Sequence, residues 1–351
     1  MEIPGKSTTK INNLQALRAL AAGVVAFRHI GQQLHFHAIG SFGVDIFFVI
    51  SGFVMAQICE SGRTKSFFLR RVARIVPLYW GATLSLFSVA VIAPGLLIET
   101  RPNAVYLLLS LLFIPFRKAT GQIEPFLFLG WTLNFEMYFY VLLSIGLLLW
   151  PKRAVWLTAA MIAAVFLLVT GGSSVFSLFY GDSIVFEFVA GSIVFYMYNA
   201  MGHERARRLR FVFIALAVLA MGSIPWPDFL YAIPPNMRGI YLGIPAACLV
   251  GSIVGLSRGG FDSPWRWIVL LGDASYVMYL SHPFVEIGLE KSFLFLIPLL
   301  THQVFIMSSL ILIGVALASV VIYRTVDLPV QRLLKFGGSK PGSLSVIGTA
   351  Q

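Results

Sequence analysis

The chain has 351 residues, of which 58% are apolar or aromatic and only 12% are charged, whereas soluble domains have about 25% charged residues. This composition, with a mean hydropathy of +0.84, excludes a soluble globular protein. The net charge of +11 does not indicate a nucleic-acid partner, because the basic residues lie in the short connections between apolar runs rather than on one face.

Apolar runs recur along the whole chain at about 17 to 25 residues, the length that a helix needs to cross the hydrocarbon layer. The sequence therefore predicts an all-α, polytopic membrane protein. The ten expected spans are residues 14–34, 42–59, 74–95, 129–150, 154–171, 178–199, 209–224, 239–257, 268–288 and 303–324. We expect one integral-membrane domain over residues 1–335 and a flexible cytoplasmic tail over residues 336–351.

The apolar segment 103–116 is short for a crossing, so the charges around it decide its status. With this segment left out, the basic connections all fall on one side of the membrane, as the positive-inside rule requires. We therefore expect a re-entrant or outer-face segment, both termini in the cytoplasm, and a multi-pass protein of a bacterial-type inner membrane. Cys59 and Cys248 lie in apolar runs without metal-ligand spacing, so no metal site is expected.

The first two spans carry Arg18, His29 and Asp45, although ionisable groups in hydrocarbon cost about 2.5 to 3.5 kcal/mol each on insertion scales. Arg18 and His29 are eleven residues apart, so they share one helix face, about 16 Å apart along it. His29 and Asp45 lie at similar depth near the outer side, and direct contact is expected. A carboxylate beside an imidazole favours a general base. The alternative is a structural pair that joins two helices.

A basic connection follows the second span and contains Arg63, Lys65, Arg70, Arg71 and Arg74. Arg71 and Arg74 are three residues apart and share a helix face, where two guanidiniums can bind a phosphate-bearing ligand. Anchoring to anionic lipid headgroups is an equally good interpretation from charge alone.

The fourth span begins with GWTLNFEMYFY, residues 130–140. Thr132, Glu136 and Tyr140 are spaced by four residues and are expected to face inward together. Glu136 lies about as deep as His29 and is a second candidate to orient it. Trp131 and Asn134 are possible acceptor or support residues, although an interfacial aromatic belt explains most of the aromatic side chains here.

The ninth span contains LGDASYVMYLSHPFVE, residues 271–286. Tyr276, Tyr279 and His282 lie on one stripe, and Pro283 is expected to kink or end the helix. His282 is a possible support residue in the outer half of the membrane, and a helix-packing hydrogen bond explains it equally well. Glu187 in the sixth span is a weaker candidate.

Several of these motifs, in this order, resemble those of a known family. They are LQALRALAAGVVAFRH, FGVDIFFVISGFVM, FLRRVARIVPLYW, GWTLNFEMYFY, FEFVAGSIV and LGDASYVMYLSHP. The chain resembles the integral-membrane acyltransferase 3 proteins, which O-acylate cell-surface sugars, over nearly its full length. Within that family, Gln15 and GWTLNFEMYFY look most similar to exopolysaccharide-production acetyltransferases.

The resemblance implies an O-acyltransferase that uses acyl-CoA, usually acetyl-CoA, as its donor and has no permanently bound cofactor. It places the arginine-to-histidine motif on Arg18 and His29 and the basic motif on Arg71 and Arg74. Together with the depth of the polar groups, it predicts that Arg70, Arg71 and Arg74 bind the phosphates of acyl-CoA, that the pantetheine arm passes Arg18, and that His29 is the base. Asp45 or Glu136 would orient it.

The acceptor is expected to be a glycan or lipid-linked sugar at the outer face, with membrane lipids and polysaccharide-synthesis machinery as further partners. A transporter or flippase of lipid-linked sugar is the alternative, because the same intramembrane charges can form a proton or substrate path. A membrane scaffold for polymer export is a third possibility.

Overall fold

The computed structural model describes residues 10–36, 40–96, 101–224, 233–234, 237–297 and 303–334. Within these ranges every regular element is a helix, and one isolated bridge pairs Arg117 with Ile123. The α-helices of the first half are α1 (Asn12–Gln33), α2 (Phe42–Glu60), α3 (Phe67–Ile92), α4 (Ala104–Leu111), α5 (Gly130–Leu149), α6 (Ala154–Val169), α7 (Val175–Tyr180) and α8 (Phe186–Ala200). Those of the second half are α9 (His203–Arg208), α10 (Arg210–Gly222), α12 (Ile244–Arg258), α13 (Arg266–Asp273), α14 (Ser275–Leu296), α15 (Val304–Ile322) and α16 (Leu328–Leu333). Short turns of other helix types complete them: η1 (Pro94–Leu96), η2 (Pro151–Arg153), η3 (Ser183–Val185), η5 (Gly239–Gly243) and η7 (Tyr323–Asp327).

Fewer helices are suited to cross a membrane than the ten that the sequence predicted. In the described part of the chain, seven are long and apolar enough, or eight if the bent pair α13 and α14 forms one span. The helix α10 has only 13 residues. The helix α1 has 22 residues, but its arginines, histidine and amides make it too polar to be recognised by composition. The all-α class is confirmed, whereas the count of about ten is not.

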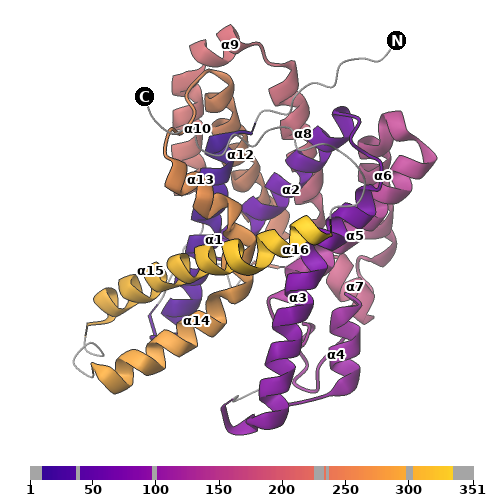
Figure 1. Ribbon diagram of the computed structural model, residues 1–351. Helices are drawn as coiled ribbons and strands as arrows, with labels where there is room; N and C mark the ends of the chain where they lie inside the picture. The colour runs from indigo at the N-terminus through magenta and orange to yellow at the C-terminus, as the bar shows by residue number, and fades with distance from the viewer. Residues whose placement is uncertain are drawn as a thin grey trace.

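Helix α2 lies inside the bundle and packs most extensively against α8 (Figure 1). The two helices cross where Gly52 faces Phe188 and Gly191 faces Val49. A Cβ atom on Gly191 would lie 1.9 Å from the carbonyl oxygen of Val49, and one on Gly52 would lie 2.0 Å from that of Phe188. Only glycine permits this approach, and small residues are the usual means by which membrane helices come close.

The polar helix α1 is wrapped by apolar ones, because it contacts α2, α12, α13, α14 and α15. Its first turn is held by Asp262, whose carboxylate accepts hydrogen bonds from the backbone N–H groups of Asn12 (3.0 Å) and Asn13 (2.7 Å). This contact satisfies backbone donors that a helix N-terminus leaves free. The position of α1 inside the bundle explains how a polar helix fits a membrane protein.

The segment predicted to be re-entrant or at the outer face forms α4, a helix of eight residues. Eight residues extend about 12 Å, so α4 does not cross a hydrocarbon layer of about 30 Å. It lies beside the second half of α3 (Figure 1), where Trp80 Nε1 donates to the carbonyl of Leu111 at 2.9 Å and Tyr79 OH to that of Ser110 at 3.3 Å.

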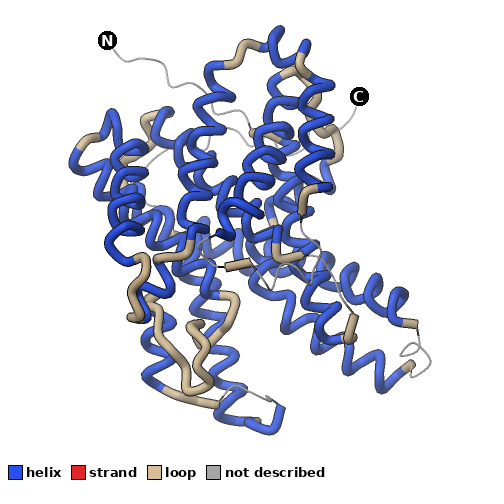
Figure 2. The backbone as a smooth tube through the Cα atoms, turned by 180° about the vertical axis from the view of Figure 1, so that it is seen from behind, coloured by secondary structure: helices blue, strands red, loops and turns tan. Residues whose placement is uncertain are grey.

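The ninth predicted span differs from expectation in the position of its bend. Helix α14 continues past Pro283 to Leu296, so this proline does not end the helix. The sharp bend, of 72°, lies instead between α13 and α14. Beyond it, α14 and α15 run side by side away from the rest of the bundle (Figures 1 and 2).

Candidate functional site

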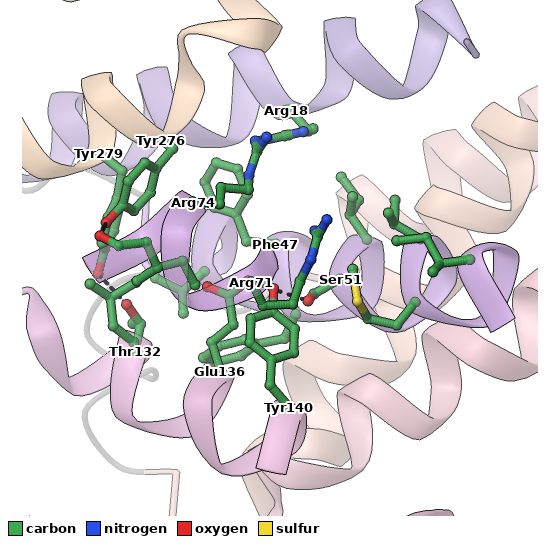
Figure 3. Close-up of a pocket in the computed structure, with 18 residues that line it drawn as sticks. Arg18, Phe47, Ser51, Arg71, Arg74, Thr132, Glu136, Tyr140, Tyr276 and Tyr279 are labelled. Atoms are coloured by element: carbon green, nitrogen blue, oxygen red, sulfur yellow. Dashed lines mark hydrogen bonds between the residues drawn. The ribbon is translucent and has the colours of Figure 1, made fainter. Parts of the chain in front are cut away.

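A cavity of about 290 Å³ lies between α1, α2, α3, α5 and α14 and is lined by eight of the polar residues that the sequence singled out. Figure 3 shows how they face one another. The charged and polar lining residues are Arg18 from α1, Ser51 from α2, Arg71 and Arg74 from α3, Thr132, Glu136 and Tyr140 from α5, and Tyr276 and Tyr279 from α14. Apolar side chains such as Phe47 and Phe48 complete the wall.

Three arginines give this cavity a positive charge that its own carboxylate does not neutralise. Arg18, Arg71 and Arg74 face the single carboxylate of Glu136 among the lining residues. The Nε atom of Arg71 is buried and has no hydrogen-bond partner among the described residues. A buried donor without a partner costs about 1 to 3 kcal/mol, so the cavity is built to receive an acceptor of hydrogen bonds, and its charge favours an anion.

Glu136 is held in place by two hydroxyl groups. It accepts a hydrogen bond from Tyr140 OH, one turn along α5, and another from Ser51 Oγ of α2 at 3.4 Å. The row Thr132, Glu136 and Tyr140 faces the cavity together, as the four-residue spacing predicted. Glu136 therefore lies with the arginines and not with His29.

Two tyrosines fix α14 against its neighbours at the other end of the cavity. Tyr276 OH donates to the carbonyl of Ile75 at 2.7 Å. Tyr279 OH donates to the carbonyl of Leu129 at 3.1 Å and lies 2.9 Å from Thr132 Oγ1. Tyr279 thus joins α14 to the start of α5 at the edge of the cavity.

His29 lies outside this set of lining residues and pairs with His282. The two rings stack with their centroids 5.1 Å apart, and His29 also meets the edge of Phe128 at 5.3 Å. The ring of Tyr279 lies 6.1 Å from that of His282, so Tyr279 and His282 connect the cavity to His29. His282 is fully buried. Its Nδ1 lies 3.3 Å from the carbonyl of Met278, while its Nε2 has no partner among the described residues.

The direct contact expected between His29 and Asp45 is not formed. Asp45 instead binds Arg238, with Nε donating to Oδ1 at 3.0 Å and Nη2 to Oδ2 at 2.8 Å. Two parallel charge-assisted hydrogen bonds satisfy a buried carboxylate better than one imidazole can. The guanidinium of Arg238 also lies 5.8 Å from the ring centroid of Trp131, which places Trp131 in this cluster.

Sequence reasoning missed Arg238. A signal was present in the sequence. Arg238 lies just before the predicted span 239–257, in a connection that the predicted topology places outside the membrane, and the positive-inside rule disfavours a basic residue there. Two predicted residues also lie away from the cavity. The Arg70 guanidinium donates to the carbonyl of Arg63, and Asn134 is buried with an Oδ1 atom that has no partner in the described part of the chain.

Comparisons with known proteins place the chain in an acyltransferase family. Residues 11–324 match the family described as an acyltransferase domain. The exopolysaccharide production protein ExoZ of Rhizobium meliloti (strain 1021) is 34% identical over 266 residues, which cover 71% of this chain and 78% of that protein. The acyltransferase MdmB of Streptomyces mycarofaciens is 27% identical, with 78% of each chain covered. Nodulation protein 10 of Rhizobium leguminosarum bv. viciae is 31% identical over 43% of this chain and 49% of its own. No solved structure matches the chain.

Proposed function

Because this chain belongs to the acyltransferase family, whose domain it matches over residues 11–324, we propose that it transfers an acyl group from acyl-CoA to a hydroxyl of an exopolysaccharide or cell-surface glycan. Family membership makes it an O-acyltransferase, and its long apolar helices make it a membrane protein. The polysaccharide acceptor is inferred from the Rhizobium meliloti relative named for exopolysaccharide production. Acetyl is the expected acyl group.

One observation carries the choice of donor, namely the three arginines that face a single carboxylate in the cavity. Acyl-CoA carries several phosphate groups, and the planar guanidinium binds phosphate through two donors at once. Arg71 also offers a buried Nε atom without a partner among the described residues. We infer that phosphates of the donor bind at Arg71 and Arg74 on the cytoplasmic side, and that the pantetheine arm passes Arg18.

The stacked histidines supply the base in this proposal. The acyl group passes Tyr279 and reaches His29, which takes the proton from the attacking sugar hydroxyl as the new ester bond forms. The bond between the carbonyl carbon and sulfur then breaks, and the departing thiolate of CoA accepts that proton. Stacking on His282 holds the His29 ring in place. A covalent acyl-imidazole on His29 is the variant of this mechanism.

The deciding experiment uses the purified full chain with acetyl-CoA labelled in the acetyl group and candidate glycans. We expect label to enter the glycan and free CoA to be released in equal amounts. Movement of an ion or of lipid-linked sugar across a vesicle membrane, without release of CoA, would overturn the proposal and support a transporter. If neither acyl transfer nor transport is observed, the result would favour a scaffold.

A further inference from the structure

A second cavity, of about 510 Å³, lies between α8, α10 and α12. It shares no lining residue with the first cavity, which Arg18, Arg71 and Arg74 line and which is called the arginine cavity below. The three helices stand together in Figures 1 and 2, and α12 contacts both of the others. The volume lies within the range of about 300 to 1,000 Å³ that is typical of small-molecule sites. Almost all of its lining residues are apolar.

The floor of this cavity is a row of small residues spaced by four along η5 and α12. These are Gly239, Gly243, Ala247, Gly251 and Gly255, and all five line the cavity. Residues four apart share one helix face, so the row lines one side of the cavity, with Gly243 packed under Glu187 and Gly255 under Phe213. At Gly251 an added Cβ atom would meet only the methyl groups of Val194, at 3.8 and 3.9 Å.

The rim of this cavity, which is called the groove below, is apolar and open. Ile193 and Met197 of α8, Leu216 of α10, and Ile240 and Ile244 at the start of the α12 span are exposed and line it. Both α8 and α12 lie in segments long and apolar enough to cross a membrane. A groove with such a rim faces hydrocarbon, so its natural occupant is a hydrocarbon chain that enters from the side.

One end of the groove carries a buried polar group, the carboxyl group of Glu187. Glu187 lines the cavity and is only 2% exposed, and neither of its carboxyl oxygens accepts a hydrogen bond from a donor group of the described residues; its carboxyl group lies beside that of Asp45. Its Oε1 atom would lie 3.0 Å from a Cβ atom on Gly243, so the carboxyl group lies directly over the groove floor. Leaving a buried polar group without a partner costs free energy, which a ligand that donates hydrogen bonds would recover.

The charge around Glu187 narrows the chemistry of that ligand. Asp45, Arg238 and Asp182 are its electrostatic neighbours. This cluster has three carboxyl groups and one guanidinium, and the guanidinium is already bound to both oxygens of Asp45. A phosphate headgroup would be repelled here, whereas an uncharged hydroxyl group can donate to the oxygen of Glu187 that does not face Asp45.

We propose that the groove between α8, α10 and α12 binds a glycolipid, with its hydrocarbon chain along the glycine floor and its uncharged, hydroxyl-bearing head at Glu187. The inference rests on the proposed function and adds that the sugar acceptor is presented on a lipid. Val44 of α2 lines the arginine cavity, while the next residue, Asp45, belongs to the polar cluster beside the groove. Helix α2 therefore lies between the proposed lipid head and the donor in the arginine cavity.

The test uses the full chain in detergent-free nanodiscs and an alkyl glucoside with a photoreactive diazirine in its chain. We expect labelled peptides from α8, α10 and α12, and competition by dodecyl glucoside but not by dodecylphosphocholine. Gly251→Leu fills the groove and should abolish this labelling, with Gly251→Val as a smaller second variant. Gly288→Leu is the matched control, because Gly288 is exposed on α14 and an added Cβ atom there meets nothing within 4 Å.

Glu187→Leu tests the head separately. This variant should keep the labelling and lose the preference for the glucoside over the phosphocholine. Labelling that survives Gly251→Leu, or that lies outside these helices, would overturn the chain site. Equal competition by dodecylphosphocholine in the unaltered protein would overturn the glycan head and leave an ordinary lipid site. Binding of acetyl-CoA is measured in parallel, so failure of the donor proposal is distinguished from failure of this one.

Discussion

Asp45 and Arg238 form an ion pair with two hydrogen bonds, at 3.0 and 2.8 Å, that joins α2 to the beginning of the α12 span. Asp45 is fully buried, and the Arg238 side chain is 22% exposed. Removing one partner of a buried pair leaves a charge without compensation, which is far more costly than removing both. The pair therefore makes a prediction about stability that does not depend on the chemistry of the enzyme.

Arg238→Ala should lower the free energy of unfolding by about 3 to 5 kcal/mol, measured as a lower melting temperature in detergent. The double variant Asp45→Asn with Arg238→Ala should regain part of that loss. Lys10→Ala is the control, since its partner Asp273 and Lys10 itself are both partly exposed, and such pairs contribute about 0 to 1 kcal/mol. Equal melting temperatures for Arg238→Ala and the double variant would contradict coupling.

Replacing Arg71 or Arg74 with Ala should weaken binding of acyl-CoA. Hydrogen bonds to charged groups contribute about 1.5 to 3 kcal/mol, so each change should raise the dissociation constant about 10- to 150-fold. Arg71→Lys should not restore binding, because lysine lacks the planar fork. The measurement is titration of acetyl-CoA into the purified protein.

Arg70→Ala is the matched control for that experiment. Arg70 precedes Arg71 on the same helix but donates to the carbonyl of Arg63 and does not line the cavity. Donor affinity should be unchanged in this variant. A similar loss at all three positions would indicate that this part of α3 acts through its overall positive charge, as in the lipid-anchor interpretation.

Replacing His29 with Ala should lower kcat by about 10²- to 10⁴-fold, the usual contribution of a general base. The affinity for acetyl-CoA should stay the same, because His29 lies outside the arginine cavity. The rate of CoA release measures the change in kcat, and an equilibrium titration measures the affinity for acetyl-CoA. Full acyl transfer in this variant would refute the base assignment, and a lost donor affinity would place His29 in the donor site instead.

Gly191→Val should destabilise the bundle, because a side chain there collides with the carbonyl of Val49 at the crossing of α2 and α8. Overpacking of this kind costs about 1 to 3 kcal/mol or more. Gly81→Ala on α3 is the control, since its Cβ atom meets nothing within 4 Å. Melting temperatures of the two variants compare them, and an unchanged value for Gly191→Val would show that the crossing can open without cost.

The order and approximate limits of many helices follow from the sequence, because a bilayer imposes a minimum length on each apolar run. Helices α2, α5 and α15 begin and end within a few residues of their predicted spans. Local periodicity was equally reliable. Arg71 and Arg74, and the row of Thr132, Glu136 and Tyr140, share the faces that the 3.6-residue repeat predicted, and all of them line one cavity.

Contacts between helices were decided by the tertiary structure. Periodicity gives the face on which a side chain lies but not the helix that packs against that face, so depth alone made His29 the expected partner of Asp45. Packing instead brings in Arg238, 193 residues away along the chain, and sets His29 against His282. The count of about ten crossings is not confirmed, because seven or eight helices qualify by length and composition, while α1 is polar where neighbouring helices surround it.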